Sequence, residues 1–441
     1  MKTGFSKRCI TPPYGIAIGG YFRPRRVKGV LDDLYARVVV FDDGESYATI
    51  ITLDLIDLPE NMFERIKDAI CDATDIKREA IFINCSHTHT GPRFGYDGAT
   101  DEESPEYYNE FFVNNVKTGV LYALDDLKES TIETAKTEAK RIAFVRRFRM
   151  KNGKVLTNPG VGNPEIDHPL SEVYEGVHLV KIVRDGGNDI YMVNFGCHAD
   201  TTGGELISAD YPGQLCKILE NALPGIHCMF LQGCEGDVNH HDVRPSKARA
   251  TVNKKRANYP YSISEYMGRV LAGAVLSVAS LTEEVKADKL SFKVRIVDLP
   301  SYQQNEKLEE AKALYDLYRR EGRDALPYEG MEVETVLGEA SRIIKLENGP
   351  LSFPYTLSAI KIGDMVFAGI GGEAFTDIGN RIRENSPYEN TVVCCLTNCT
   401  GGYIPTSVAY EEGGYEARSS KLAPGGDNII VDGILDLIKE L

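Results

Sequence analysis

The stretches INCSHTHTGP (83–92), NFGCHADTTGG (194–204) and FAGIGGEAFT (367–376) each end an apolar, strand-like run on a side chain that can bind a metal ion. These side chains are His87, His198 and Glu373. Two imidazoles and a carboxylate are a ligand set of catalytic zinc sites, which keep one coordination position open. The three stretches therefore predict a series of strands with a shared site at their ends.

Each stretch belongs to a repeated unit of strand, helix and strand. In the first unit, an apolar strand at 47–53 precedes a helix that begins after Pro59 and a second strand at 80–84. The same order recurs over 190–231 and 365–396. Strands joined through a helix usually run parallel, and ligands bind beyond their carboxyl ends. We therefore predict an α/β fold: a mixed, largely parallel sheet or sheets flanked by helices, with the site at the C-terminal ends of the strands.

The rest of the sequence indicates one domain. Segments 105–128 and 261–281 have the periodicity of amphipathic helices that cover a sheet. The block 286–350 combines an alternating strand pattern with two charged helical stretches, and we interpret it as an insertion, either a lid, an interface or a solvated surface. Because no low-complexity linker interrupts the sequence, we expect a single catalytic domain over residues 1–441.

Composition narrows the class of partner. The 50 basic and 65 acidic side chains give a formal charge of −15, which disfavours nucleic acid and anionic membranes as partners. The N-terminus lacks the apolar core of a signal peptide, and no run of about eighteen apolar residues occurs. We expect a cytoplasmic protein without stable membrane anchoring that acts on a small molecule; the oligomeric state is not indicated. The ten cysteines lie mostly in apolar runs, which favours buried thiols over disulfides.

Each candidate ligand also has an ordinary structural explanation. His87 and His89 share a face if the segment is extended, whereas on a loop one can bind metal while the other transfers a proton. His198 alone would be a core histidine bonded to the backbone, and Glu373 alone an acidic residue favoured by a helix dipole. Their recurrence at equivalent strand ends favours a shared site.

Two further groups of residues lie close to these loops. The loop GCEGDVNHHD (233–242) could stabilise an oxyanion through Asn239 or its glycine N–H groups, or hold a second metal through Asp237, His240 and His241. A rival thiolate set matches no CxxC zinc pattern, so we interpret its members as packing residues. These are Cys85, Cys197, Cys234 and Cys399.

Six segments, in the same order, resemble the catalytic domain of the neutral/alkaline non-lysosomal ceramidases. They are GFSKRCITPP with LDDLYARVVVFDDG, SHTHTGP, NFGCHADTTGGELISADYPG, QGCEGDVN, GGEAFTDIGNRI and GGYIPTSVAYEEGGYEARSS, which together extend from residue 4 to about 420. The resemblance implies one zinc ion bound by His87, His198, Glu373 and Tyr403. It also implies that His89 is a hydrogen-bonding or proton-transfer partner. It suggests Arg147 and His240 as substrate-binding residues, with Arg146 as another match to the arginine that lines the family's pocket.

The sequence departs from this family at one functional position. The family carries a serine in G-D-V-S-P-N, whereas this chain has Asn239 there and His240 in place of the proline. Asparagine cannot act as the nucleophile that this serine is often taken to be. We also expect no C-terminal β-sandwich domain, because the sequence ends near residue 441, and we expect a small soluble substrate in place of ceramide.

These observations predict a zinc-dependent hydrolase that cleaves an amide, or less favourably an ester, by water attack. The proton-transfer group would be His89 or Asp237, and Asn239 and Tyr403 would stabilise the oxyanion. A basic segment could meet an anionic substrate tail; it comprises Arg244, Lys247, Arg249, Lys254, Lys255 and Arg256. Two alternatives stay open: a di-metal phosphoesterase that also uses Asp54, and a non-catalytic metal- or carbohydrate-binding relative.

Overall fold

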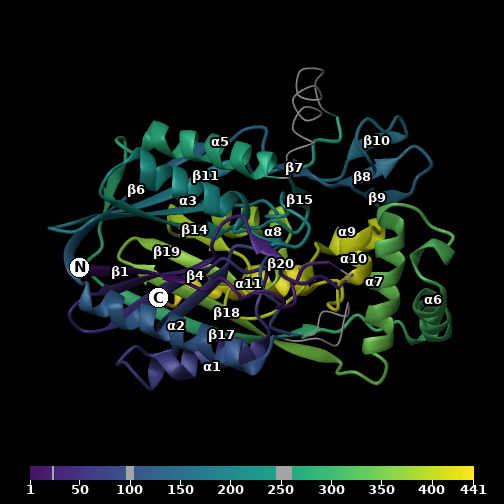
Figure 1. Ribbon diagram of the computed structural model, residues 1–441, viewed down its shortest axis with the longest axis horizontal. Helices are drawn as coiled ribbons and strands as arrows, with labels where there is room; N and C mark the ends of the chain where they lie inside the picture. The colour runs from purple at the N-terminus through teal and green to yellow at the C-terminus, as the bar shows by residue number, and fades with distance from the viewer. Residues whose placement is uncertain (22–23, 96–103, 245–260) are drawn as a thin grey trace.

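The structure is a computed structural model that describes residues 1–21, 24–95, 104–244 and 261–441. Within these residues, the largest element is a nine-stranded sheet of order β14-β12-β11-β6-β1-β3-β4-β5, with β16 paired to β6 (Figure 1). Its strands are β1 Lys2–Cys9, β3 Tyr35–Asp42, β4 Tyr47–Leu53, β5 Ile81–Cys85, β6 Lys128–Glu138, β11 Gly176–Arg184, β12 Asp189–Phe195, β14 Ile226–Gln232 and β16 Glu283–Val285.

A second, four-stranded sheet has the order β17-β18-β19-β21. Its strands are β17 Leu290–Pro300, β18 Ser352–Ile362, β19 Met365–Ile370 and β21 Asn390–Cys394. Short pairings complete the described strands: β2 Gly29–Val30 with β13 Leu206–Ile207, β7 Phe144–Val145 with β15 Val238–Asn239, β20 Glu373–Ala374 with β22 Tyr403–Ile404, and β8 Arg147–Met150 with β9 Val155–Thr157 and β10 Ile166–Pro169.

The three predicted units are present. They are β4-α1-β5, β12-α3-β14 and β19-α8-β21, with α1 Glu60–Cys71, α3 Asp210–Ala222 and α8 Thr376–Asn385. The two strands of each unit pair in parallel. The mixed α/β class with flanking helices is therefore confirmed.

The expectation of a largely parallel arrangement is wrong. In the two large sheets, every other described pairing is antiparallel. The reason lies in tight turns that precede each unit, between β3 and β4, β11 and β12, and β18 and β19. Each turn contains a glycine with positive φ (Gly44, Gly186 and Gly363), and such short connections can join only antiparallel strands. The repeat is thus a hairpin followed by a helix and a parallel strand.

The second strands of the three units end at one point inside the molecule. The Gln232 N–H donates to Oδ1 of Asn84 at 2.9 Å, and the Cys395 N–H donates to the Gln232 carbonyl at 2.9 Å. Nδ2 of Asn84 closes the ring by donating to the Cys395 carbonyl at 2.5 Å. This ring of hydrogen bonds brings together the loops that follow β5, β14 and β21.

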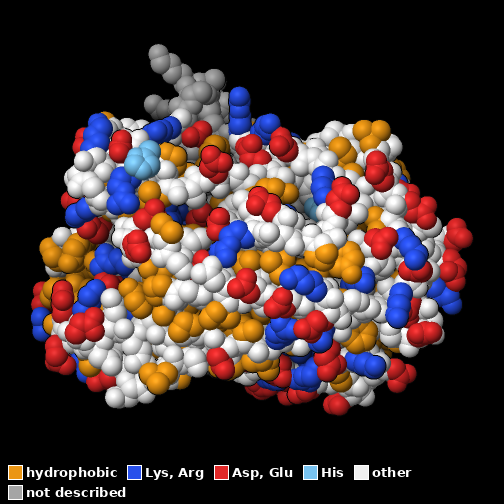
Figure 2. Space-filling model, turned by 180° about the vertical axis from the view of Figure 1, so that it is seen from behind, with side chains coloured by type: hydrophobic (Ala, Val, Ile, Leu, Met, Phe, Trp, Pro, Cys, Tyr) orange, Lys and Arg blue, Asp and Glu red, His pale blue; other side chains and the backbone are white. Residues whose placement is uncertain are grey.

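Helices cover the outer faces of the sheets. In Figure 1, α3 and α5 (Ser262–Val278) lie on one side of the molecule, and α1 and α2 (Glu106–Asp125) lie on the opposite side. The second sheet is covered by α11 (Gly426–Lys439), which packs on β17 and β18. No described helix combines the length and apolar character needed to cross a bilayer. On the face shown in Figure 2, acidic and basic side chains are mixed.

The block interpreted as an insertion has two parts. Its strand, β17, pairs with β18 along its whole length and so belongs to the second sheet. Its helices, α6 (Leu308–Glu321) and α7 (Met331–Lys345), lie at one end of the molecule beside α9 (Ser407–Glu412) and α10 (Tyr415–Ser419) (Figure 1). The division into one domain with an insertion at 286–350 stays a prediction.

Candidate metal centre

Three buried imidazoles meet beyond the strand ends, and their ring nitrogens could hold a metal ion together. Nδ1 of His87 lies 2.9 Å from the Ile56 carbonyl, and Nδ1 of His89 lies 3.0 Å from the Gly20 carbonyl. Nδ1 of His198 lies 3.0 Å from the carbonyls of both Glu235 and Val238. A carbonyl only accepts, so each Nδ1 carries the proton and each Nε2 offers a lone pair.

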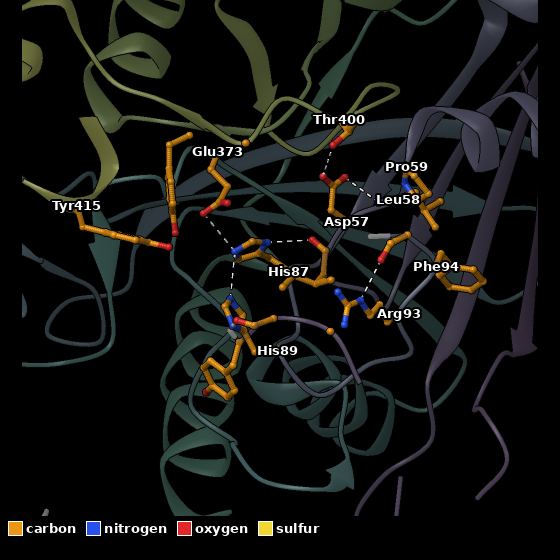
Figure 3. Close-up of a pocket in the computed structure, with 17 residues that line it drawn as sticks. Asp57, Leu58, Pro59, His87, His89, Arg93, Phe94, Glu373, Thr400 and Tyr415 are labelled. Atoms are coloured by element: carbon orange, nitrogen blue, oxygen red, sulfur yellow. Dashed lines mark hydrogen bonds and ion pairs between the residues drawn. The ribbon is translucent and has the colours of Figure 1, made fainter. Parts of the chain in front are cut away.

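The Nε2 atoms converge on one another and on a carboxylate. Those of His87 and His89 are 3.3 Å apart, too close for two lone pairs without a shared proton or cation. Oε2 of Glu373 lies 3.4 Å from Nε2 of His87 and 3.0 Å from Nε2 of His198. Figure 3 shows His87 between Glu373 and His89. This arrangement fits a divalent cation, because backbone-oriented imidazoles with free Nε2 atoms are what a metal site requires.

The pKa values of His198, His89 and Glu373 are shifted toward the protonation states that bind metal, which are a neutral imidazole and an ionised carboxylate. Burial and the adjacent Arg146 guanidinium lower the pKa of His198 to about 3. Burial, together with His87, holds the pKa of His89 well below its ordinary value. Burial opposes ionisation of Glu373, but the imidazoles of His87 and His198 hold its pKa well below the usual range. His198 and His89 are therefore neutral and Glu373 is ionised at neutral pH.

Local backbone geometry places these side chains. His87 has a φ of +67°, an uncommon left-handed conformation that the surrounding loops must hold in place. The loop after β14 also passes very close to β20. A Cβ atom at Gly236 would overlap the backbone of Glu373. Glycine at 236 therefore allows the loop after β14, whose Glu235 and Val238 carbonyls orient His198, to approach Glu373.

Tyr403, the fourth expected ligand, pairs with Glu373 across the short parallel β20–β22 ladder. Its ring stacks over that of His198 with centroids 6.4 Å apart. Burial and the nearby Glu373 raise the pKa of Tyr403 well above its ordinary value. The structure thus brings all four expected ligands and His89 into one cluster.

The Arg146 side chain lies beside the candidate ligands, whereas the Arg147 side chain contacts the loop around Glu412. Nη1 of Arg146 is 3.1 Å from Nε2 of His198, and its guanidinium lies 5.1 Å from the centre of the Tyr403 ring. Arg147 instead bonds Glu412 at 3.1 Å and the Gly413 carbonyl at 2.8 Å. The structure therefore places Arg146, the residue less favoured from the sequence, beside the candidate ligands.

Asp237 is engaged at the start of a helix. Its Oδ1 accepts the N–H of Thr376 at 2.8 Å and the Thr376 hydroxyl at 2.9 Å, so it caps α8 from a distant loop. Asn239 donates to Asn158 at 2.6 Å and accepts the His241 N–H at 2.9 Å. These contacts are those of positioning residues. Neither residue lines the cavity beside the histidines, and their predicted catalytic roles stay predictions.

Substitution of Asp237 distinguishes a helix-capping role from a proton-transfer role. We expect Asp237→Ala to cost about 1 to 2 kcal/mol in the free energy of unfolding, because the first turn of α8 loses its acceptor. Asp237→Asn keeps an acceptor oxygen and should cost less. Urea unfolding of the two variants measures the difference. Loss of turnover in Asp237→Asn at unchanged stability would instead assign Asp237 the proton transfer.

The remaining candidates lie elsewhere or outside the described residues. The His240 ring packs against His241 in a tilted arrangement with centroids 4.1 Å apart, and its substrate-binding role stays a prediction. Asp54 forms a buried ion pair with Arg37 at 2.8 Å and belongs to neither metal-binding group formed by the described residues, and the di-metal alternative stays a prediction. Of the basic segment only Arg244 is described, and it donates to the Ile166 and Asp167 carbonyls; the others lie outside the described residues.

The cysteines are packing residues, as predicted. All ten thiols are free, and eight of them are buried. Burial raises the pKa of the Cys85 and Cys197 thiols well above the ordinary value, so neither is a thiolate at neutral pH. The metal-binding groups formed by the described residues contain no cysteine.

A cavity of about 460 Å³ opens beside the cluster. His87, His89 and Glu373 line one wall, and Leu58 and Phe94 line the opposite, apolar side (Figure 3). A second cavity, of about 490 Å³, shares Glu373, Tyr403 and Tyr415 with the first and extends toward α7. The candidate ligands therefore lie where the two cavities meet.

The sequence did not single out Glu235. Its carboxyl group is fully buried within reach of His87 and Glu373. Burial raises the pKa of Glu235 well above its ordinary value, and the nearby Glu373 adds to this effect. The only indication of Glu235 in the sequence is its place in the GCEGDVNHHD loop, beside Asp237, His240 and His241.

Fold and site together define a mixed α/β protein with a histidine–carboxylate cluster at converging strand ends. The fold is neutral ceramidase-like: the chain superposes over its whole length on 75% of a neutral ceramidase from Pseudomonas aeruginosa, with a TM-score of 0.75 and 18% identity. A structure described as a ceramidase complexed with C2 matches over the same shares, with a TM-score of 0.74 and 17% identity. The sequence matches no protein-family model and no curated protein.

Proposed function

We propose that this protein is a zinc-dependent hydrolase that cleaves an amide bond in a small soluble molecule. The observation that carries the proposal is the convergence of the Nε2 atoms of three backbone-oriented imidazoles and the Glu373 carboxylate beside a cavity. The structurally similar proteins are named ceramidases, and ceramide is an amide, which supports this bond class.

One zinc ion would be held by His87, His198, Glu373 and Tyr403. When bound, such an ion supplies a water of lowered pKa and polarises the carbonyl of the substrate. Tyr403 must lose its proton to become an anionic ligand, so metal uptake would release that proton to solvent. Other divalent cations that accept imidazole and carboxylate ligands are alternatives for the same residues.

The other residues of the cluster would manage protons and charge. His89 keeps its proton on Nδ1 through the Gly20 carbonyl, so Nε2 can accept a proton from the attacking water and return it to the leaving amine. The Arg146 guanidinium, which contacts His198, would stabilise negative charge that develops on the substrate oxygen. Asn239, whose amide already bonds Asn158 and His241, is the weaker candidate for that role.

The two cavities suggest how an amide would lie. The acyl part would occupy the first cavity against Leu58 and Phe94, and the amine part the second. Each cavity falls within the range of small-molecule sites, roughly 300 to 1,000 Å³. The scissile bond would then lie at Glu373 and Tyr403, which line both.

The test is turnover with and without metal. Purified protein would be stripped with a chelator, reloaded with zinc, and incubated with panels of N-acyl amino acids, N-acyl amines and the matching esters. We expect amide hydrolysis that disappears on stripping and returns on reloading, with one zinc per chain by elemental analysis. Two metals per chain would favour a dinuclear site, and zinc binding without turnover on any panel would favour a binding protein.

A further inference from the structure

Glu235 is a buried acid without a partner. It follows β14 in the loop that carries Asp237, and its side chain is fully shielded from solvent. Neither carboxyl oxygen makes a hydrogen bond or an ion pair with any other described residue. Burial of such a group costs several kcal/mol unless a partner compensates it, so the position requires an explanation.

The surroundings of Glu235 point to a cation. One of its oxygens lies within 4.8 Å of a ring nitrogen of His87 and of a Glu373 oxygen. Its own backbone carbonyl accepts the Nδ1–H of His198, so the same residue also orients a candidate ligand. Two adjacent buried carboxyl groups repel each other when ionised, and a divalent ion bound by both removes the repulsion.

Arg146, whose charge acts on Glu235, directs its nitrogens to other groups. Arg146 directs Nε to Glu416 at 2.7 Å and Nη2 to the Gly236 carbonyl at 2.7 Å. Its Nη1 faces His198 at 3.1 Å. Each of the three guanidinium nitrogens therefore faces a group other than Glu235.

We propose that Glu235 is a ligand of the metal centre, which would then bind its cation through two carboxylates. This inference rests on the metal site proposed above. The additional carboxylate makes the ligand set richer in hard oxygen donors, which favours a harder cation such as Mn²⁺ relative to a site with a single carboxylate. It also neutralises both charges of the cation before Tyr403 loses its proton.

Metal affinity of Glu235 variants tests the assignment. Dissociation constants for Zn²⁺ and Co²⁺ would be measured by chelator competition on Glu235→Gln and Glu235→Leu, together with the visible spectrum of the Co²⁺ form. We expect affinity to fall at least about tenfold, the scale on which loss of metal-supporting groups acts, and the Co²⁺ bands to change at saturation. Wild-type affinity and spectrum in both variants would overturn the assignment.

Two controls make the result specific. Asp57→Asn removes a partly buried carboxyl from the wall of the cavity that His87 lines, one already bonded to Thr400 at 3.0 Å, and its metal affinity should change less than in Glu235→Gln. Thermal unfolding of metal-free Glu235→Leu should occur at the wild-type temperature or above it, because an unpaired buried acid has been removed. A wild-type protein that binds no metal would refute the whole centre, whereas unaffected variants of a metal-binding protein would refute only the role of Glu235.

Discussion

Replacing His198 with alanine is expected to remove metal binding at micromolar concentrations and to lower kcat/KM for an amide substrate by about three orders of magnitude. That loss corresponds to about 4 kcal/mol of transition-state stabilisation. Nδ1 of His198 is fixed by two carbonyls, and Nε2 lies 3.0 Å from Glu373. Because burial and the Arg146 guanidinium lower its pKa to about 3, the His198 imidazole is neutral at neutral pH and can offer its lone pair.

A second buried histidine provides the matched control. His178, on β11, is also buried with a pKa lowered to about 3, but its Nε2 bonds Thr134 at 2.8 Å, outside the metal-binding groups. We expect His178→Ala to lose stability and to keep full metal content. Elemental analysis and turnover of both variants would decide. Metal and turnover retained in His198→Ala would exclude His198 as a ligand.

The elements of the fold were predictable from periodicity, but their pairing was only partly so. Apolar runs and amphipathic faces located β4, α1 and β5 to within a residue or so. Parallel pairing within each unit followed from the helical crossover. The antiparallel hairpins depend on short glycine turns such as that at Gly186, whose signal is weaker than that of the helices.

The site was predictable where it depends on position in the repeat. His87 follows β5, while His198 and Glu373 follow β12 and β19, the parallel neighbours of β14 and β21. Because the ends of β5, β14 and β21 meet, the three side chains converge. Arg146 arrives from the irregular region around β7 and β8, and no local pattern places it beside His198. Likewise, nothing in the sequence shows that Glu235 lacks a partner, because that property depends on what every neighbouring loop brings.

Asp237 is a residue that the sequence proposed for catalysis and whose hydrogen bonds the sequence could not predict. An aspartate in a loop after a strand was a reasonable proton-transfer candidate, but the structure engages it with Thr376, 139 residues away. A helix capped by a residue so distant in sequence carries no local capping signal. Non-local hydrogen bonds of this kind decide between a catalytic and a positioning role, and only tertiary structure reveals them.

Replacing Glu416 with glutamine is expected to produce the largest loss of stability among the substitutions proposed, about 3 to 5 kcal/mol, since it breaks a buried ion pair on one side only. Glu416 is fully shielded from solvent and holds Arg146 at 2.7 Å, Arg147 at 3.7 Å and the Thr157 hydroxyl at 2.8 Å. Glutamine keeps the shape but leaves two buried guanidinium groups short of negative charge.

The neighbouring Glu412 is the control for this prediction. It bonds Arg147 at 3.1 Å but its side chain is 19% exposed, so water can replace the lost interaction. We expect Glu412→Gln to cost about 1 kcal/mol or less in urea unfolding. Equal losses in the two variants would contradict the distinction between a buried and a rim ion pair.

The Arg146–Glu416 pair should also matter to the metal centre. Without Glu416, the Arg146 charge beside His198 is uncompensated and repels a cation, so metal affinity should fall together with stability. In the double variant Arg146→Met/Glu416→Leu, both charges are absent, and stability should recover because apolar replacements of buried ion pairs are often neutral or stabilising. Recovery of stability and metal binding without recovery of turnover would show that Arg146 acts on the reacting substrate, whereas full turnover would make the pair a purely structural support.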